Sequence, residues 1–377
     1  MNILIAPDSF KDCMTASEVA SALSRGIREV MGDATIQVVP LADGGEGTVD
    51  AVIQATGGSL ITAHVLDPLA RPTDSFYGIT GDGQTAVIEM AAASGIELLR
   101  QEERNPWITS TYGTGQLIRD ALDRGCSTIL IGIGGSATND GGSGMAKALG
   151  IRFLNRGGAE IANGGGGLGE LQSIDLKGLD PRIRQTRILV ACDVTNPLTG
   201  PEGASVIYGP QKGADPDMVA RLDNHLAHFA RIVKEQMDLD VSGIPGSGAA
   251  GGLGAGLIAF LDAGLAKGFE LVAETVSLEE KIMKADLVIT GEGKMDHQTQ
   301  FGKTPFGVAQ LARKHGKRVI GVAGSLEEGA EVLYRHGFDL LLSIQEKPEE
   351  LSHALKKAGS QLVRAGERIG RMLTLTR

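Results

Sequence analysis

The sequence lacks the features that mark several specialised classes of protein. Its three cysteines lie far apart and match neither a disulfide framework nor a metal-ligand spacing. A reducing compartment, the cytoplasm, is therefore expected. The formal net charge is −10, and the sequence has no block of basic residues and no basic patch interleaved with aromatics. Neither nucleic acid nor an anionic membrane is expected as a partner.

Long hydrophobic runs are also missing. The chain begins with a short apolar stretch before Pro7 and has no cationic segment there, which predicts a strand rather than a signal peptide. The longest uncharged stretch, residues 241–261, contains seven glycines and one proline. Such a segment is too poor in hydrocarbon to span a bilayer. We expect neither export nor membrane insertion.

Two common catalytic patterns are absent as well. No G-x-S-x-G nucleophile elbow occurs, and none of the cysteines has a catalytic local pattern, which argues against a hydrolase. A P-loop is excluded by spacing. Gly302, Lys303 and Thr304 match the end of that motif, but His297 occupies the position of its first glycine.

Glycine, in contrast, is abundant. It accounts for 54 of the 377 residues, about twice the usual share of roughly 7%. The glycines cluster after short β-branched runs, and segments with helical spacing of apolar residues follow the clusters. This alternation predicts an α/β fold with mainly parallel sheets, and the length predicts about two domains.

Polar residues follow the predicted strands, and ligands in open α/β sheets bind at the carboxyl ends of the strands. The candidates at these ends are Asp8, Ser9, Lys11, Asp43, Glu46, Ser136, Asn139, Asp140, Asp193, Asn196, Glu292, Lys294 and Asp296. A single acidic residue in such a place is most often the cap of the next helix. Five strand ends with carboxylates, several beside glycines, are better explained by a ligand.

The segment GIGGSA, residues 132–137, matches the dinucleotide-binding pattern and raises an alternative, an NAD-dependent dehydrogenase of a small hydroxy acid. No acidic residue ends a second strand about 20 residues later, where a ribose partner is expected. The hydroxyl, amide and carboxylate side chains of residues 136–140 also exceed what a pyrophosphate requires. A phosphate-binding turn near a metal ion explains this loop better.

Two further glycine-rich segments each have two interpretations. GSGAAGGLGAG, residues 246–256, opens a helix, and it either packs closely through its small residues or presents a helix N-terminus to an anion. GPQKGA, residues 209–214, holds Lys212 in a tight loop. That lysine is either solvated or a contact for phosphate.

Taken in order, these segments resemble the bacterial type 1 glycerate kinase family. The resemblance rests on APDSFKD, LADGGEGT, GTGQLI, GIGGSATNDGG, ACDVTNPLTG, GPQKGA, GSGAAGGLG and TGEGKMDHQT followed by GK, which cover nearly the whole chain. It implies phosphoryl transfer from ATP to D-glycerate with Mg²⁺. The family favours the 2-position, so 2-phosphoglycerate is the expected product and 3-phosphoglycerate the alternative. No motif bears on the oligomeric state.

The resemblance also implies two α/β domains, the second inserted into the first, with an active cleft between them. We expect a discontinuous Rossmann-like domain, residues 1–65 plus 275–377, and an inserted domain, residues 66–274. Phosphoryl transfer needs cations around the phosphates, carboxylates for Mg²⁺ and a base for the acceptor hydroxyl, all of which the sequence offers. A non-catalytic nucleotide sensor gives no reason for so many carboxylates.

The candidate residues receive roles on this basis. The catalytic candidates are Asp296, Asp193 and Lys303, and Asp296 is the first choice for the general base. The substrate-binding candidates are Ser9, Lys11, Asp43 and Glu46. The nucleotide-binding candidates are Gly134, Gly135, Ser136, Asn139 and Lys212. The metal candidates are Glu292 and Asp140.

Overall fold

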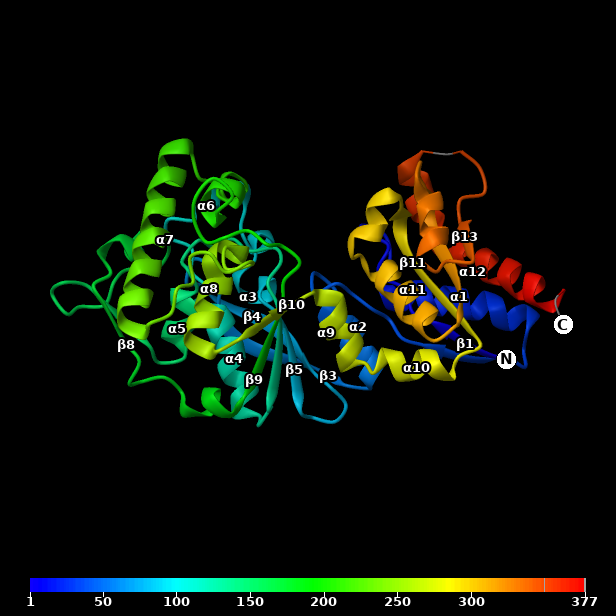
Figure 1. Ribbon diagram of the computed structural model, residues 1–377, viewed down its shortest axis with the longest axis horizontal. Coiled ribbons are helices and arrows are strands. Elements are labelled where there is room, and N and C mark those ends of the chain that lie inside the picture. The colour runs from blue at the N-terminus through cyan, green and yellow to red at the C-terminus, as the bar shows by residue number, and fades with distance from the viewer. Residues whose placement is uncertain (349, 376–377) are drawn as a thin grey trace. The chain divides into compact units, whose positions relative to one another are not determined.

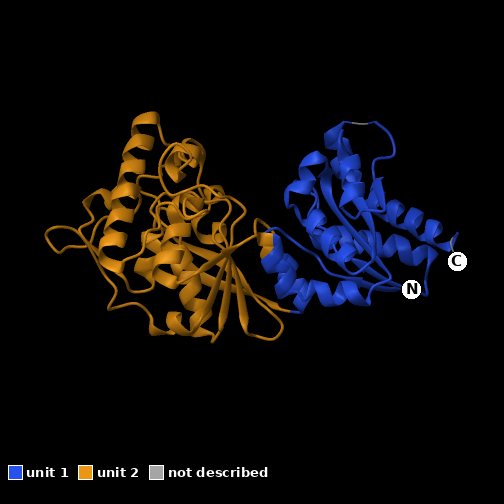
Figure 2. Cartoon of the chain, in the orientation of Figure 1, with its two compact units in different colours: residues 1–43, 50–57, 269–377 blue, residues 44–49, 58–268 orange. Residues whose placement is uncertain are grey.

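The protein is described from a computed structural model in which residues 1–348 and 350–375 are placed. It has an α/β fold with mainly parallel sheets, which confirms the fold class predicted from the sequence. The chain divides into two compact units (Figure 2). Unit 1 comprises residues 1–43, 50–57 and 269–377, and unit 2 comprises residues 44–49 and 58–268.

Unit 1 contains a five-stranded parallel sheet in the order β13-β12-β11-β1-β2. Its strands are β1 (Asn2–Ile5), β2 (Thr35–Val38), β11 (Leu287–Met295), β12 (Arg318–Leu326) and β13 (Leu340–Ser343). Its helices are α1 (Ala16–Val30), most of α2 (Thr48–Thr56) and α9 (Gly268–Thr275), α10 (Leu278–Lys284), α11 (Thr304–Lys314) and α12 (Leu351–Thr374). In β1, Ile3, Leu4 and Ile5 are all buried, as expected for a parallel strand covered on both faces.

Helix α1 shows how local sequence sets these elements. Thr15 and Glu18 form a reciprocal capping box at its N-terminus, which satisfies backbone N–H groups that have no partner inside the helix. Its apolar residues recur with helical spacing, so Val19, Leu23 and Ile27 lie on one buried face. That face packs into the same core as the strands and α12.

Helices α1 and α12 lie side by side in unit 1 (Figure 1). Two glycines make this close approach possible. A Cβ atom at Gly26 would collide with the carbonyl oxygen of Val363, and one at Gly366 would collide with that of Leu23. The crossing therefore fixes how closely α12 lies against α1, and the first turns of α12 line the cavity described below.

We expect Gly26→Ala to lower the free energy of unfolding by about 1–3 kcal/mol, because the added methyl group forces the two helix backbones apart. Gly359→Ala on α12 is the matched control. Its Cβ would lie 3.7 Å from Met14 Cε, an ordinary contact, so alanine should stabilise the helix by up to about 1 kcal/mol. Thermal melting of the two variants tests this, and equal melting temperatures would show that the crossing tolerates a side chain.

Unit 2 contains a six-stranded sheet in the order β10-β9-β6-β5-β4-β3 and a two-stranded sheet of β7 and β8. The strands are β3 (Ser59–Leu66), β4 (Pro72–Ile79), β5 (Thr85–Glu89), β6 (Thr128–Gly132), β7 (Arg152–Leu154), β8 (Ser173–Asp175), β9 (Arg187–Ala191) and β10 (Gly264–Ala266). The helices are α3 (Ala91–Ser94), α4 (Tyr112–Asp123), α5 (Ser143–Ala148), α6 (Ala204–Tyr208), α7 (Pro216–Met237) and α8 (Ala249–Leu261). Strand β3 pairs with β4 along its whole length, which groups residues 58–65 with unit 2 rather than with the expected first domain.

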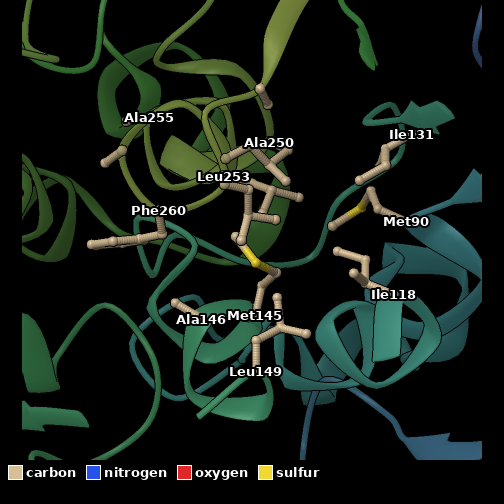
Figure 3. Packing of buried hydrophobic residues seen from close by; sticks show 14 of the residues in the cluster. Met90, Ile118, Ile131, Met145, Ala146, Leu149, Ala250, Leu253, Ala255 and Phe260 are labelled. Atoms are coloured by element: carbon tan, nitrogen blue, oxygen red, sulfur yellow. The ribbon is translucent and has the colours of Figure 1, made fainter. Parts of the chain in front are cut away.

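The core of unit 2 forms where α5 and α8 meet the sheet and α4. Figure 3 shows Leu253 of α8 and Met145 of α5 pointing toward one another, with Met90 and Ile118 beside them. Helix α8 is kinked directly after its first residue, where residues 250–252 are in the left-handed region. A Cβ at Gly251 would collide with the Thr138 carbonyl oxygen, so segment 246–256 packs closely through its small residues, as the first of its two interpretations states.

None of the helices among the placed residues combines the length and apolar character needed to cross a membrane.

Candidate active site

A cavity of about 640 Å³ lies at the carboxyl edge of the unit 1 sheet. Because all five strands are parallel, the residues that follow them gather at this edge. The polar residues that line the cavity include Asp8, Ser9, Lys11, Asp43, Glu292, Lys294 and Lys303. The structure thus brings together five of the residues to which the sequence gave roles: Ser9, Lys11, Asp43, Glu292 and Lys303.

Asp8 follows β1, which lies between β11 and β2 in the sheet, and its pKa is the most altered among the carboxylates that line this cavity. The backbone N–H groups of Ala6 and Asp8 donate to Ile289 and Gly291, so the chain stays paired with β11 beyond the end of β1. Burial, with the nearby charges of Asp43 and Glu292, raises the pKa of Asp8 to about 6, although the Thr304 hydroxyl and the Ser9 N–H favour its charged form. A carboxylate with this pKa can accept a proton near neutral pH. The sequence nominated Asp8 by its place but gave it no role.

Glu292 and Lys303 form an ion pair at the cavity. Glu292 Oε2 accepts a hydrogen bond of 3.0 Å from Lys303 Nζ, and its Oε1 accepts one of 2.8 Å from the Thr299 hydroxyl. Burial raises the pKa of Glu292, while Lys303 and Thr299 act in the opposite direction. Lys303 immediately precedes α11 and its side chain is 38% exposed. The pair therefore holds an accessible cation at the cavity wall.

Asp296 does not line the cavity among the placed residues. It caps the 3₁₀ helix His297–Phe301: its carboxylate accepts a 2.8 Å hydrogen bond from the Gln298 N–H, and its backbone N–H donates to the Thr299 hydroxyl. Burial opposes ionisation of Asp296, but the Gln298 N–H and the charges of Lys303 and Lys294 outweigh it and lower its pKa. Asp296 therefore has the helix-capping role that the sequence analysis gave as the common alternative to a ligand contact. Its predicted catalytic role stays a prediction.

The remaining candidates lie in unit 2. Lys212 is fully buried, and its Nζ donates hydrogen bonds of 2.7 Å to the Ser136 hydroxyl and to the Thr138 carbonyl oxygen. Burial lowers the pKa of Lys212 to about 7, although Asp140 favours the charged form. Lys212 is therefore not the solvated lysine of the first interpretation; it holds the loop that follows β6.

Asp140 is also fully buried. Its carboxylate accepts hydrogen bonds from the Thr111 N–H and hydroxyl and from the N–H groups of Gly142 and Gly144, at the start of α5. Burial raises the pKa of Asp140, and these hydrogen bonds oppose the rise. Its carboxylate is already occupied by bonds within unit 2, so this geometry suits anchoring of the loop. The metal-binding role predicted for Asp140 stays a prediction.

The other unit 2 candidates are more accessible or differently engaged. Asn139 is buried and donates to the Ser205 hydroxyl at 3.0 Å. Asp193, exposed after β9, accepts a 3.1 Å hydrogen bond from the Gly268 N–H. Gly134, Gly135 and Glu46 are exposed.

The apolar part of the cavity wall was missed by the sequence analysis. Phe10 and Cys13 follow β1, Ile344 follows β13, and Leu355 and Ala358 come from the first turns of α12. The rule that nominated the polar residues also applies to the end of β13, and its use there would have found Gln345. The helix residues carry no pattern that separates them from ordinary core positions.

Comparison with known proteins settles the family. The model of the glycerate kinase family matches residues 3–374. The chain belongs to the glycerate kinase family. The glycerate 2-kinase of Escherichia coli (strain K12) is 51% identical over 375 residues, which cover 100% of this chain and 98% of that protein. A glycerate kinase of Halalkalibacterium halodurans is 51% identical over 367 residues, 97% of each chain.

A solved structure agrees with the family assignment. A crystal structure attributed to glycerate kinase 2 from Salmonella typhimurium LT2 superposes with a TM-score of 0.92 at 48% sequence identity, covering 100% of this chain and 99% of that one. The resemblance inferred from the ordered motifs is confirmed. As a member of the glycerate kinase family, the protein is a phosphotransferase with an alcohol group as acceptor, and the dehydrogenase alternative is excluded.

Proposed function

We propose that the protein is a cytoplasmic glycerate 2-kinase, which transfers the γ-phosphoryl group of ATP to the 2-hydroxyl of D-glycerate with Mg²⁺ as cofactor. The observation that carries the proposal is the cavity of unit 1, where Lys11 and Lys303 meet Asp8, Asp43 and Glu292. A small hydroxy acid needs a cation for its carboxylate and acceptors for its hydroxyl groups, and this wall supplies both kinds of group.

Asp8 is proposed as the base that accepts the proton of the attacking hydroxyl, the role for which the sequence favoured Asp296. It lines the cavity, and its raised pKa of about 6 brings it close to the operating range of a general base. Ser9, Lys11 and Asp43 are proposed to bind glycerate from the same edge. Asp193 remains a second candidate for the base.

Lys303 is proposed to stabilise the negative charge of the transferring phosphoryl group. Phosphoryl transfer depends mainly on positioning and on charge stabilisation by such groups. Lys303 is held at the cavity by Glu292, which limits the directions its Nζ can take. In unit 2, the exposed backbone of Gly134 and Gly135 is proposed to contact phosphate, and Lys212 shapes the loop that carries them.

The donor set fits Mg²⁺, although no cluster of three or more metal-binding side chains occurs in residues 1–348 and 350–375. Mg²⁺ usually keeps several waters and is held by one or two carboxylates together with substrate phosphates. Glu292 is the carboxylate proposed for this purpose. When bound, the ion would neutralise charge on the phosphates of ATP.

The product and the metal requirement test the proposal directly. We expect the purified protein to form 2-phosphoglycerate from ATP and D-glycerate, measured with coupled enzymes that distinguish it from 3-phosphoglycerate. EDTA should abolish the activity and added Mg²⁺ should restore it. Formation of the 3-isomer alone would overturn the position of transfer, and activity that survives chelation would remove the metal from the mechanism.

A further inference from the structure

The cavity of unit 1 changes in chemical character along the sheet edge. Most of its charged residues lie in or after β1, β2 and β11, and Glu327 follows β12, whereas the wall beside β13 and the start of α12 has no charged residue and is mainly apolar. Phe10 and Ile344 are almost completely buried there, and the Cys13 thiol donates to the Leu355 carbonyl oxygen at 3.2 Å, which ties the turn after β1 to α12. From β1 to β13 is three strand spacings, or about 14 Å.

Glycerate can occupy only the charged end of this cavity. It is a three-carbon acid with two hydroxyl groups, so it has almost no apolar surface to bury and is too short to reach from β1 to β13. Placing its polar groups against Phe10, Ile344 and Leu355 would leave them without hydrogen bonds, which is costly. The apolar end must serve another ligand or another part of the reaction.

We infer that this apolar end, the wall formed by Phe10, Cys13, Ile344, Leu351, Ala354, Leu355 and Ala358, binds the purine base of the nucleotide substrate. The inference rests on the proposed kinase function, because the second substrate of a kinase carries a flat base with apolar faces. The cavity volume of about 640 Å³ lies in the range of small-molecule sites.

Polar groups at the same end suit the edge of a base. Gln361 is 3% exposed and lines the cavity, and Ser325 and Gln345 line it from the ends of β12 and β13. An amide carries both a donor and an acceptor, so a glutamine can meet the alternating donors and acceptors of a purine edge. A site with apolar walls and a few polar groups of this kind is typical of cofactor pockets.

Filling the apolar end tests the inference. Ala354→Phe places an aromatic ring in the cavity from a half-buried position on α12, and Ser352→Phe adds the same ring at an exposed neighbouring position. With titration calorimetry, we expect Ala354→Phe to weaken ADP binding at least tenfold and to leave inorganic tripolyphosphate and D-glycerate binding unchanged. Ser352→Phe should bind all three like the wild type. Normal ADP binding by folded Ala354→Phe would overturn the inference.

Protection of Cys13 from alkylation supplies a measurement on the wild-type protein, so the inference stays testable if the variant does not fold. Burial and the charge of Glu18 raise the pKa of Cys13, so labelling is done at about pH 9 and read by mass spectrometry, with tripolyphosphate in place of ADP as the control. ADP should slow labelling of Cys13, whereas tripolyphosphate should not. Equal labelling of Cys13 with and without ADP would also overturn the inference.

The two proposals fail in different ways. Suppose that the wild type forms phosphoglycerate from ATP, but ADP does not protect Cys13 and Ala354→Phe does not weaken ADP binding. The proposed kinase function then stands, and the proposed site for the purine base is wrong. If the wild type forms no phosphoglycerate but ADP binding is lost in Ala354→Phe, the nucleotide site stands and the proposed reaction is wrong.

Discussion

Asp8→Asn should lower kcat by about 10²- to 10⁴-fold, the usual cost of losing a general base, and should at the same time raise the melting temperature. Asn keeps the shape of Asp but cannot accept the proton. In the wild type, kcat/KM plotted against pH should fall below about pH 6, because burial raises the pKa of Asp8 to about 6. The residual activity of Asp8→Asn should not show this fall.

The stability gain follows from the direction of the pKa change. The folded protein holds a proton on Asp8 up to about pH 6, whereas an unfolded chain loses it near 3.8. The free energy of unfolding therefore falls as pH rises from about 4 to 6. Above pH 6 the folded protein carries the whole cost of holding Asp8 ionised in a buried place. Asp8→Asn removes this charge and should therefore raise the free energy of unfolding by about 1–3 kcal/mol at pH 7.5. The melting temperature should rise by several degrees.

Asp296→Asn is the comparison that decides between the two carboxylates. Asn is also a good capping residue, and Asp296 lies outside the cavity lining, so this variant should keep kcat within about tenfold and melt slightly lower. A collapse of kcat in Asp296→Asn, with normal kcat in Asp8→Asn, would return the general base to the residue chosen from the sequence.

Lys303→Met should reduce kcat by about 10²- to 10³-fold, the cost of removing one preorganised group that stabilises charge in the transition state. Lys303→Arg keeps the charge and should recover part of the rate. Lys303→Met also leaves Glu292 partly buried without its cation, so the pKa of Glu292 should rise further. The profile of kcat against pH should then shift to higher pH.

Lys294→Met is the matched control for this effect. Lys294 lines the same cavity, but its side chain is 58% exposed and lies 3.4 Å from Asp296 rather than on Glu292. Its loss should cost less than tenfold in kcat. Steady-state kinetics of the three variants give the comparison, and equal losses in Lys294→Met and Lys303→Met would mean that the cavity needs only its general positive potential.

Periodicity was sufficient to predict the parallel sheets, and strand-end position nominated several residues that line the unit 1 cavity. Ser9, Lys11, Asp43 and Glu292 meet at one cavity because parallel strands place their carboxyl ends together. Lys303 precedes α11 and lines the same cavity, where it pairs with Glu292. This is a property of topology, and the alternation of strands and helices encodes it.

The rest depended on burial, which local sequence does not reveal. A tight glycine loop around Lys212 fits a phosphate contact as well as a buried anchor, and only the distances of 2.7 Å to Ser136 and Thr138 show how the lysine is engaged. Asp8 and Asp296 both follow strands beside polar residues. Their opposite pKa changes arise from neighbours far apart in the chain for Asp8 and from a local helix cap for Asp296.

The pairing of β1 with β11 joins residues that are synthesised far apart in time. Ile3 aligns with Leu287, and the whole of residues 58–268 is translated between the two strands. At about 5–20 residues per second, the ribosome needs roughly ten to fifty seconds to travel from Gly57 to Leu287. During that interval the nascent chain of unit 1 exposes the β11-facing edge of β1, while the main segment of unit 2 emerges complete and can fold first. Asp8 and Glu292 therefore come together late in the life of the nascent chain, so the cavity is completed only after most of the protein has been made.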